Sequence, residues 1–318
     1  MNDAIDVKAI GRAPKQQNAA RRKNIWSRRF FIFAFLIFPL INFVVFYLYA
    51  NIDSFFMAFQ KEDYSQGSKQ IVWTLDNFSN LWTLLTGSGH ELLYAFLNTL
   101  YFNLIGTFVG LPIGILMAYF VYKKIHGYRF FRAVIYLPSI VASSALVVLF
   151  KYAIGDGGPL DAMITASGGE YFYLLSRSPA AILTILFYYV TFGYGGSIVI
   201  IGGAMNGINP DILEAAAVDG CNWFQELTQV ILPCIWPTIS TILLLSVANF
   251  FSATGPILAF TKGANQTFTL AYYIYALVSG AGLNQNLYLA SALGICMSLL
   301  AFPAALLVKR LLYGKEGE

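Results

Sequence analysis

The chain has 318 residues, of which 58% are hydrophobic and only 11% are charged. This composition is too apolar for an ordinary soluble domain, and the apolar residues are spread too evenly for a single membrane anchor. The net charge of +4 comes from basic residues distributed over several short loops, so the sequence shows no nucleic-acid footprint. We therefore expect a polytopic membrane protein.

Six apolar runs have lengths near ~20 residues, which is what a helix needs to cross about 30 Å of hydrocarbon. Uninterrupted runs favour helices over barrel strands, which are shorter and alternate in polarity. The expected fold class is an all-α membrane protein with six transmembrane helices. The runs lie at about 30–50, 93–122, 131–153, 180–204, 234–260 and 287–308.

The basic residues predict the orientation of the chain. If the N-terminus is inside, the inside segments hold fifteen of the 20 Lys and Arg residues. This bias predicts a multi-pass membrane protein with both termini in the cytoplasm. The five basic residues on the outside are Lys61, Lys69, Lys151, Arg177 and Lys262.

Residues 1–29 form a basic N-terminal segment that we expect to lie in the cytoplasm. The apolar run that follows starts late and has no small-residue cleavage pattern, so we expect a retained helix, kinked at Pro39, and no cleavable signal peptide. After it comes a long outer segment, and its stretch WTLDNFSNLWTLL (73–85) has amphipathic spacing. We expect a short helix there, either as a lid over the helix ends or as a docking surface.

The next two runs contain packing and turn signals. In the second run, small residues recur every fourth position from Gly106 to Ala118, which places them on one face and predicts close helix packing. The third run is followed by the sequence Gly155-Asp156-Gly157-Gly158, which predicts a turn.

The fourth and fifth runs carry polar groups at membrane depth. The fourth contains YYVTFGYGGS (188–197) and the fifth SVANFFSATGP (246–256), with the amide of Asn249 in an apolar context. Polar groups at this depth tend to face a bundle interior or a cavity. Aromatic rings beside hydroxyls suit a sugar, although ordinary packing between helices explains most of these residues singly.

Charged residues are absent from the centres of all six runs. This argues against proton- or sodium-coupled transport and favours neutral cargo with energy supplied from outside the chain. An ion-gradient-driven secondary transporter of a neutral solute is the alternative. There is no phosphate-binding loop, no paired nucleophile and base, and no metal-ligand spacing, and the three cysteines show no pairing pattern, so we expect no catalytic residues, no metal and no cofactor.

The polar insertion NPDILEAAAVDGCNWFQELTQVILP (209–233) lies between the fourth and fifth runs. It is acidic where an inside loop is normally basic. Asn209 before Pro210 predicts an N-cap and a short helix, Gly220 a left-handed terminator, and Asn222 with Gln225 a capping box for a second helix.

The alanines of this insertion give the first helix a slim surface that another protein could approach closely. Glu214 and Asp219 are then anionic points for a cationic partner. A solvated helical hairpin explains the same residues equally well.

Here the sequence resembles a known family. Glu214-Ala215-Ala216, then Gly220 and Leu232-Pro233, are similar to the EAA signature of permease subunits in binding-protein-dependent ABC importers, and the longer pattern ending at Pro237 is similar to the branch for carbohydrate uptake. Further similarity covers most of the chain, including Asn98-Thr99-Leu100 and Tyr136-Leu137-Pro138.

The resemblance implies a type I ABC importer permease fold, in which the insertion supplies coupling helices, at 209–232, that sit in a groove of a cytoplasmic ATPase. By position, the resemblance assigns coupling to Glu214, Ala215, Ala216, Asp219, Gly220, Leu232 and Pro233. It assigns sugar contacts to Tyr189, Gly193, Tyr194, Ser246, Asn249, Phe250 and Ala253.

The organisation expected is a transmembrane domain at 30–308 and a cytoplasmic tail at 309–318. The resemblance implies a subunit without chemistry of its own that passes a sugar or oligosaccharide inward by alternating access, while ATP-Mg is bound by the ATPase. The implied partners are a second, unlike permease, two copies of the ATPase, an external solute-binding protein and membrane lipid, and no nucleic acid.

Overall fold

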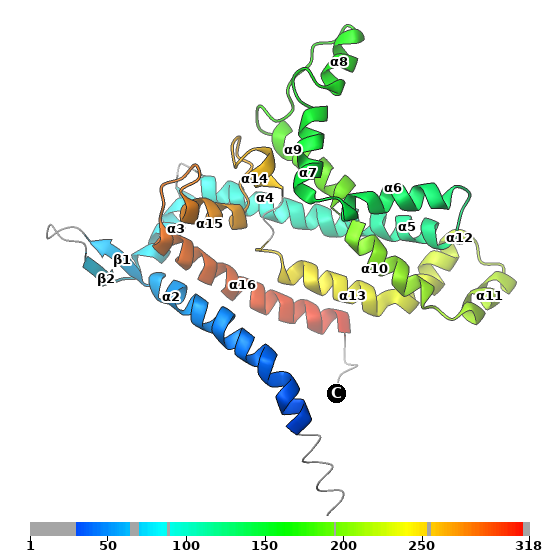
Figure 1. Ribbon diagram of the computed structural model, residues 1–318, viewed down its shortest axis with the longest axis horizontal. Coiled ribbons are helices and arrows are strands. Elements are labelled where there is room, and N and C mark those ends of the chain that lie inside the picture. Colours follow the sequence, from blue (N-terminus) through cyan, green and yellow to red (C-terminus); the bar gives the residue numbers. More distant parts are fainter. Residues whose placement is uncertain (1–29, 64–69, 88–89, 194, 253–255, 314–318) are drawn as a thin grey trace, which may run out of the picture. The chain divides into compact units, whose positions relative to one another are not determined.

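The computed structural model describes residues 30–63, 70–87, 90–193, 195–252 and 256–313. Most of these residues are helical (Figure 1). The chain divides into two compact units, Met1–Met57 and Ala58–Glu318. The elements that carry the candidate site all belong to the second unit.

The first unit contains a single described helix, Phe30–Met57, which includes Pro39, passes through a π-helical segment at Phe43–Tyr49 and ends as α2 (Ala50–Met57). It is apolar enough to cross a membrane, and none of its most apolar window is buried in the structure. Such a surface suits contact with lipid or with another apolar protein surface.

The second unit contains four further helical spans of the required length and apolarity, matching the second, fourth, fifth and sixth predicted runs. The first three are each composed of shorter helical segments, with π-helical turns at Gly106–Gly110 and Glu226–Ile231. The spans are Glu91–Tyr122, with α4 (Glu91–Ile105) and α5 (Leu111–Tyr122); Ala180–Asn206, with α9 (Ala180–Phe192) and α10 (Gly195–Asn206); Trp223–Ala248, with α12 (Trp223–Gln225) and α13 (Leu232–Ala248); and α16 (Leu287–Tyr313).

The third predicted run, 131–153, is not one straight helix. It consists of two helices, α6 (Tyr128–Ile140) and α7 (Ser143–Ala153), and the chain bends by 108° between them. Pro138 removes one amide donor from the last turn of α6, and Val141 then takes an extended backbone with ψ 141°. The number of spans is therefore six only if this bent pair counts as one.

The fifth predicted run also ends earlier than expected. Its helix stops at Ala248, and the prediction that it continues to residue 260 is wrong. Asn249 is its C-cap, where the backbone leaves the helical range with a ψ of 5°. The Asn249 side-chain Nδ2 donates to the Leu245 carbonyl at 3.0 Å, beside the last helical bond from the Asn249 amide to the same carbonyl at 2.9 Å. The polar residue that looked buried in a long span is thus the cap of a shorter one.

The predicted outer helix is present as α3 (Asp76–Thr86), and its apolar face is partly as expected. Leu81 is buried and Phe78 packs beside it, whereas Leu75 and Trp82 are exposed. A hairpin that the sequence did not predict precedes it, with β1 (Gln60–Asp63) antiparallel to β2 (Gln70–Trp73). The other short helices of the described chain are α8 (Pro159–Ala166), α11 (Pro210–Val218), α14 (Ile257–Phe260) and α15 (Leu270–Ser279).

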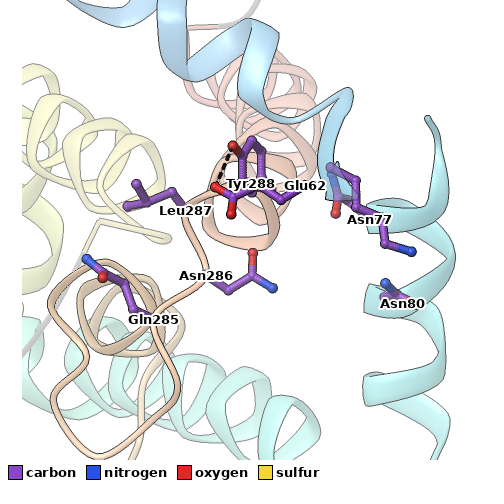
Figure 2. Close-up of a pocket in the computed structure, with 8 residues that line it drawn as sticks. Glu62, Asn77, Asn80, Gln285, Asn286, Leu287 and Tyr288 are labelled. Carbon is purple, nitrogen blue, oxygen red and sulfur yellow. Dashed lines mark hydrogen bonds between the residues drawn. The ribbon is translucent and has the colours of Figure 1, made fainter. Parts of the chain in front are cut away.

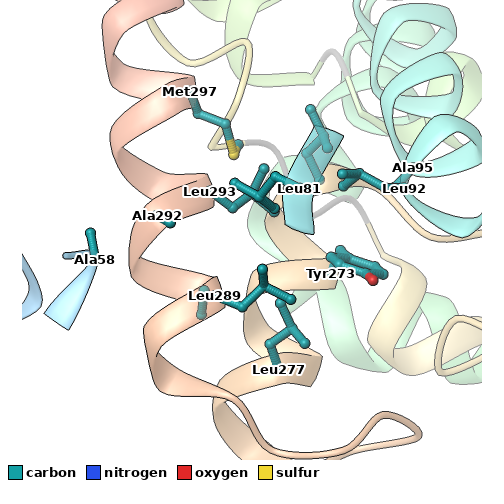
Figure 3. Close-up of a cluster of buried hydrophobic side chains, with 12 residues drawn as sticks. Ala58, Leu81, Leu92, Ala95, Tyr273, Leu277, Leu289, Ala292, Leu293 and Met297 are labelled. Carbon is teal, nitrogen blue, oxygen red and sulfur yellow. The ribbon is translucent and has the colours of Figure 1, made fainter. Parts of the chain in front are cut away.

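The apolar core forms three clusters within the second unit. In the cluster drawn in Figure 3, one face of α16 presents Leu289, Leu293 and Met297 to α3, α4 and α15. A second cluster packs α7 and α9 against α14, with Phe150, Tyr188 and Phe260 as neighbouring rings. The third joins α5, α10 and α13 on the side of the insertion.

The small-residue face predicted on the second span does pack a helix. Gly106, Gly110, Gly114 and Ala118 are all buried, and α5 lies against α10. A methyl group added at Gly114 would lie 3.7 Å from Ile198. The close approach of these two helices brings the fourth span beside the second.

Asn98 and Thr99 connect the second span to a segment far along the chain. The Asn98 Nδ2 donates to the carbonyls of Gln266 (2.7 Å) and Phe268 (2.8 Å). The Thr99 hydroxyl accepts from the Leu270 amide (2.9 Å). Both side chains are buried, and they bond to backbone groups just before and at the start of α15.

Candidate coupling elbow and cargo cavity

The first helix of the insertion begins as the sequence predicts. α11 (Pro210–Val218) has Pro210 at its first position and Asn209 as its N-cap, whose side-chain oxygen accepts from the Asp211 amide at 3.1 Å. This bond satisfies one of the free amide donors of the first turn. The start of the helix is therefore set by local sequence.

A glycine turn ends α11 and reverses the chain. Gly220 has a φ of +78°, and its amide donates to the Ala217 carbonyl at 3.2 Å, while the Cys221 amide donates to the Ala216 carbonyl at 3.1 Å. These paired bonds are those of a Schellman motif. Only glycine takes this backbone conformation without a steric penalty.

The second helix starts directly after the turn with the predicted capping box. The Asn222 side chain accepts from the amides of Phe224 (3.0 Å) and Gln225 (2.9 Å), and the Gln225 side chain accepts from the Asn222 amide (3.0 Å). α11, the turn at Gly220 and α12 form one unit that we call the elbow, residues 209–225.

The elbow presents a mixed acidic and apolar surface. Val218, Trp223 and Phe224 are 87%, 58% and 58% exposed, and the Trp and Phe rings contact each other edge to face. Ala216 instead packs inward and is buried, so the slim outer surface expected of all three alanines applies to the other two. We call the exposed set the elbow surface: Glu214, Ala215, Ala217, Val218, Asp219, Trp223 and Phe224.

Leu232 and Pro233 lie farther along, where the π-helical turn Glu226–Ile231 leads into α13. Leu232 packs against the cluster of α5, α10 and α13, whereas Pro233 is exposed. The structure thus separates these two from the elbow surface.

Glu226 behaves differently from the other acids of the insertion, and sequence reasoning missed this. Its carboxylate oxygen Oε1 lies 2.6 Å from Lys123 Nζ, and its side chain is only 13% exposed. The Tyr119 hydroxyl donates to Oε2 at 3.5 Å. Lys123 directly follows α5 and lies on the same predicted side of the membrane as Glu226. Opposite charges in two neighbouring inside loops were the available sign that such a pair could form.

A cavity of about 260 Å³ lies between the second, fourth and fifth spans. Its described lining contains no Asp, Glu, Lys, Arg or His. Amides, hydroxyls and one phenol are its polar groups, and aliphatic side chains fill the rest. The lining residues are Asn103, Gly106, Thr107, Leu111, Tyr189, Gly193, Ser197, Ile200, Ile242, Leu243, Leu245, Ser246 and Asn249.

Hydrogen bonds across the cavity join its walls. Thr107 Oγ1 and Ser246 Oγ lie 3.4 Å apart, which connects the second span to the fifth. The Asn103 Nδ2 donates to the Thr99 carbonyl at 2.9 Å and to the Phe250 carbonyl at 3.2 Å. These contacts hold the turn after α13 against α4 and leave hydroxyls along the lining.

Four of the seven predicted sugar contacts meet in this cavity: Tyr189, Gly193, Ser246 and Asn249. Phe250, two residues past the end of α13, is not among the lining residues. Tyr194 and Ala253 lie outside the residues that the structure describes.

Asn103, Thr107 and Ser197 line the cavity and were not predicted. Asn103 and Thr107 sit one helical turn apart in the second span, and this spacing of polar residues in an apolar run was the available signal. Tyr188, singled out beside Tyr189, instead packs among aromatic rings near α14.

A second, polar cleft of about 550 Å³ lies at the end of the second unit that carries the hairpin, on the side predicted to face outside. Figure 2 shows Asn77 and Asn80 of α3 on one side of this cleft and the segment from Gln285 to Tyr288 on another. The Tyr288 hydroxyl donates to Glu62 Oε1 at 2.9 Å. Asn77 donates to the carbonyls of Ala58 and Gln60. Some of the polar groups that line the cleft are therefore already used in hydrogen bonds that hold the hairpin to the helices.

The part of the chain that the structure describes contains no cluster of three or more His, Cys, Asp or Glu residues that could hold a metal ion. Its three cysteines are free thiols, and Cys221 and Cys296 are half-buried. Nothing in the described lining of the cavity pairs a nucleophile with a base.

Known proteins are similar to this chain in sequence and in fold. The family described as "Binding-protein-dependent transport system inner membrane component" matches residues 110–312. The chain is 27% identical to "Probable ABC transporter permease protein YesP" of Bacillus subtilis, over 83% of this chain and 82% of that protein. It is 28% identical to "Multiple sugar-binding transport system permease protein MsmF" of Streptococcus mutans, over 76% of this chain and 82% of that protein.

A solved structure gives the same arrangement of helices. It is described as "Crystal structure of bacterial alginate ABC transporter in complex with alginate pentasaccharide-bound periplasmic protein". The two chains superpose with a TM-score of 0.73 over 90% of this chain and 94% of that one, at 23% identity. At this identity the likeness supports a common fold.

Proposed function

The chain belongs to the family of inner membrane components of binding-protein-dependent transport systems, and we propose that it is a permease subunit of an ATP-driven importer of a neutral sugar or oligosaccharide. It has the all-α fold of ABC importer permeases. The family membership disfavours the alternative of an ion-gradient-driven transporter.

The cavity carries the cargo proposal. Its described lining offers amides, hydroxyls and the Tyr189 ring without a charged side chain. Sugars bind through this combination, because hydroxyls exchange hydrogen bonds and apolar ring faces stack on aromatic rings. The relative named as a multiple sugar-binding permease supports a carbohydrate, and the neutral lining favours an uncharged one.

The size of the cavity supports a second permease. Its volume of about 260 Å³ falls below the ~300–1,000 Å³ typical of ligand pockets. An unlike second subunit that supplies the opposite wall would complete it. An external solute-binding protein would deliver the sugar; the related alginate transporter was solved in complex with a periplasmic protein bound to an alginate pentasaccharide.

The elbow surface is the proposed contact with a cytoplasmic ATPase. Glu214 and Asp219 are exposed beside the aromatic pair of Trp223 and Phe224. Interfaces commonly combine such aromatic anchors with charges at the rim. The partner site is then a groove with basic residues and an apolar floor, one in each of two ATPase copies, which bind ATP-Mg while this chain performs no catalysis.

The π-helical turn Glu226–Ile231 joins the elbow to Leu232 and Pro233, the first residues of α13. The fifth span then reaches the cavity at Ser246 and Asn249. Closure of the ATPase pair would move the elbow and shift the bundle between outward-open and inward-open states. Both termini lie in the cytoplasm in this proposal, because the inside segments carry most of the Lys and Arg residues.

The proposal is tested by purifying the tagged chain from membranes and identifying its partners by mass spectrometry. A second permease and an ATPase should co-purify. The reconstituted complex should hydrolyse ATP faster when its binding protein carries a neutral maltooligosaccharide or xylooligosaccharide from a test panel than when it is offered an acidic oligosaccharide. Stimulation by acidic oligosaccharides alone would contradict the neutral cargo, and purification without an ATPase would contradict the importer.

A further inference from the structure

Within the described part of the chain, the insertion forms one ion pair with the rest of the bundle, between Glu226 and Lys123. Asp211, Glu214 and Asp219 are exposed, whereas Glu226 lies against the end of α5. Its ion pair with Lys123 spans 2.6 Å, with the two side chains 13% and 36% exposed. Because the Glu226 carboxylate is largely shielded from water, this pair is screened less than a pair between two fully exposed side chains.

Tyr119 strengthens the same junction from one turn earlier. Tyr119 is 2% exposed, and its hydroxyl lies 3.5 Å from Glu226 Oε2 and 3.4 Å from the Trp223 carbonyl, so its single proton can be donated to either oxygen. Trp223 is the first residue of α12 and part of the elbow surface. The second span therefore holds the elbow by side-chain contacts, although no covalent link joins them directly.

The second span also reaches the cavity. Going back along α5 from Lys123, the helix arrives at Leu111 after about 18 Å of helix rise, and Leu111 lines the cavity. Between them, Ala118 and Tyr119 pack with Leu227 and Ile231 in one buried cluster. Such a packed segment transmits a displacement as a body.

The cavity end of this segment has a feature suited to bending. The π-helical turn Gly106–Gly110 separates α4 from α5, and its first two residues, Gly106 and Thr107, line the cavity. π-helical turns interrupt the regular hydrogen-bond ladder and occur frequently at functional sites. Thr107 also faces Ser246 across the cavity, so bending here would change the contact between two cavity walls.

We propose that the Lys123–Glu226 ion pair, supported by Tyr119, is a positioning contact that fastens the elbow to α5 and passes elbow movement to the cavity turn at Gly106–Gly110. The elbow thus acts on the cavity by two routes. One is the covalent route through α13 to Ser246, and the other is the ion pair through α5 to Thr107. This inference rests on the proposed function, because it assigns a path to the movement that the ATPase would drive.

The test uses the complete reconstituted importer and measures sugar imported per ATP hydrolysed. Lys123→Ala and Glu226→Gln should each lower this ratio by about tenfold, within the range of coupling free energies between sites, while the ATPase still co-purifies. Lys123→Arg should retain the ratio. The charge-swapped variant Lys123→Glu with Glu226→Lys should recover most of it. Equal amounts of assembled complex in all variants distinguish a loss of transmission from a loss of folding.

Lys124→Ala is the matched control, because Lys124 is the neighbouring exposed lysine on the same loop. It should leave the ratio unchanged. The proposal is overturned if the single variants keep the normal ratio, if the charge swap recovers nothing, or if the variants lose the ATPase, since the pair would then only shape the docking surface. A native complex that hydrolyses ATP without importing sugar would refute the proposed function itself, and the transmission route with it.

Discussion

The elbow and the cavity are built by different kinds of interaction. At the elbow, bonds between residues at most five apart set both helix starts and the turn between them. In the cavity, the bonds that define the walls join residues more than a hundred positions apart, such as Asn103 with Phe250. The elbow is a locally specified device, whereas the cavity exists only after the spans have packed.

This difference predicts different sensitivities. A surface charge change at the elbow should disrupt docking of a partner and leave the fold intact, because the elbow side chains concerned are exposed. A change in the cavity should alter cargo transfer and leave docking intact. Four variants, in order of expected effect, can break or sharpen this contrast.

Glu214→Lys should cause the largest loss. We propose that this exposed acid faces basic residues of the ATPase, so reversing its charge would replace attraction by repulsion, and import should fall by roughly 100-fold. Co-purification of the ATPase and uptake into vesicles measure the effect. Gln229→Lys, which adds a positive charge at an exposed position of the neighbouring π-helical turn, is the control. Normal coupling in Glu214→Lys would remove the elbow from the docking site.

Trp223→Ala should weaken ATPase association by roughly 30-fold, as expected when an aromatic anchor is removed from an interface. The backbone carbonyl that accepts from Tyr119 is retained in this variant. Trp82→Ala, at a ring that is 68% exposed on the outer helix α3, should leave association unchanged. Equal effects of the two substitutions would argue for general loss of stability and against an interface.

Gly220→Ala tests the backbone conformation of the turn without creating a steric clash. A methyl group at this position would meet no atom within 4 Å, so its cost comes from the φ of +78° and amounts to ~1–2 kcal/mol. Import should fall by about tenfold as the elbow loses its geometry. Gly203→Ala, in α10 with equally open space but an ordinary helical backbone, should be tolerated. If both variants import normally, the elbow geometry does not matter.

Asn249→Ala should have the smallest effect. It removes one amide from the cavity, and losing a single hydrogen bond to a sugar should slow cargo transfer by about fivefold. Asn51→Ala is matched to it, because the Asn51 amide also donates to the carbonyl four residues earlier, at 2.7 Å, but lies in the N-terminal helix. Unchanged uptake in Asn249→Ala, with sugar still accumulating at the native rate, would place the cargo elsewhere.

The same contrast explains what the sequence could predict. Asn209, Gly220 and Asn222 were assigned their roles correctly because each acts on backbone within a few residues. The six apolar runs were located because hydrophobicity is a property of each segment. Tyr189, Gly193, Ser246 and Asn249 were brought to one cavity by the structure, but their part in sugar binding stays a prediction.

What the sequence could not predict depends on packing. The 108° break after Ile140 and the early end of α13 follow from backbone angles and caps that hydrophobicity does not encode. Asn103 and Thr107 became cavity residues only because the close packing of α5 on α10 brings the second and fourth spans together. The Lys123–Glu226 pair joins two inside loops separated by two spans, and no local rule relates them.

The most direct test of the account is uptake of a neutral oligosaccharide into vesicles that contain the complete complex. With binding protein outside and ATP supplied to the ATPase side, sugar should accumulate against its gradient, and a proton or sodium gradient without ATP should drive no uptake. Accumulation driven by an ion gradient, in vesicles that contain this chain but no ATPase, would contradict the account.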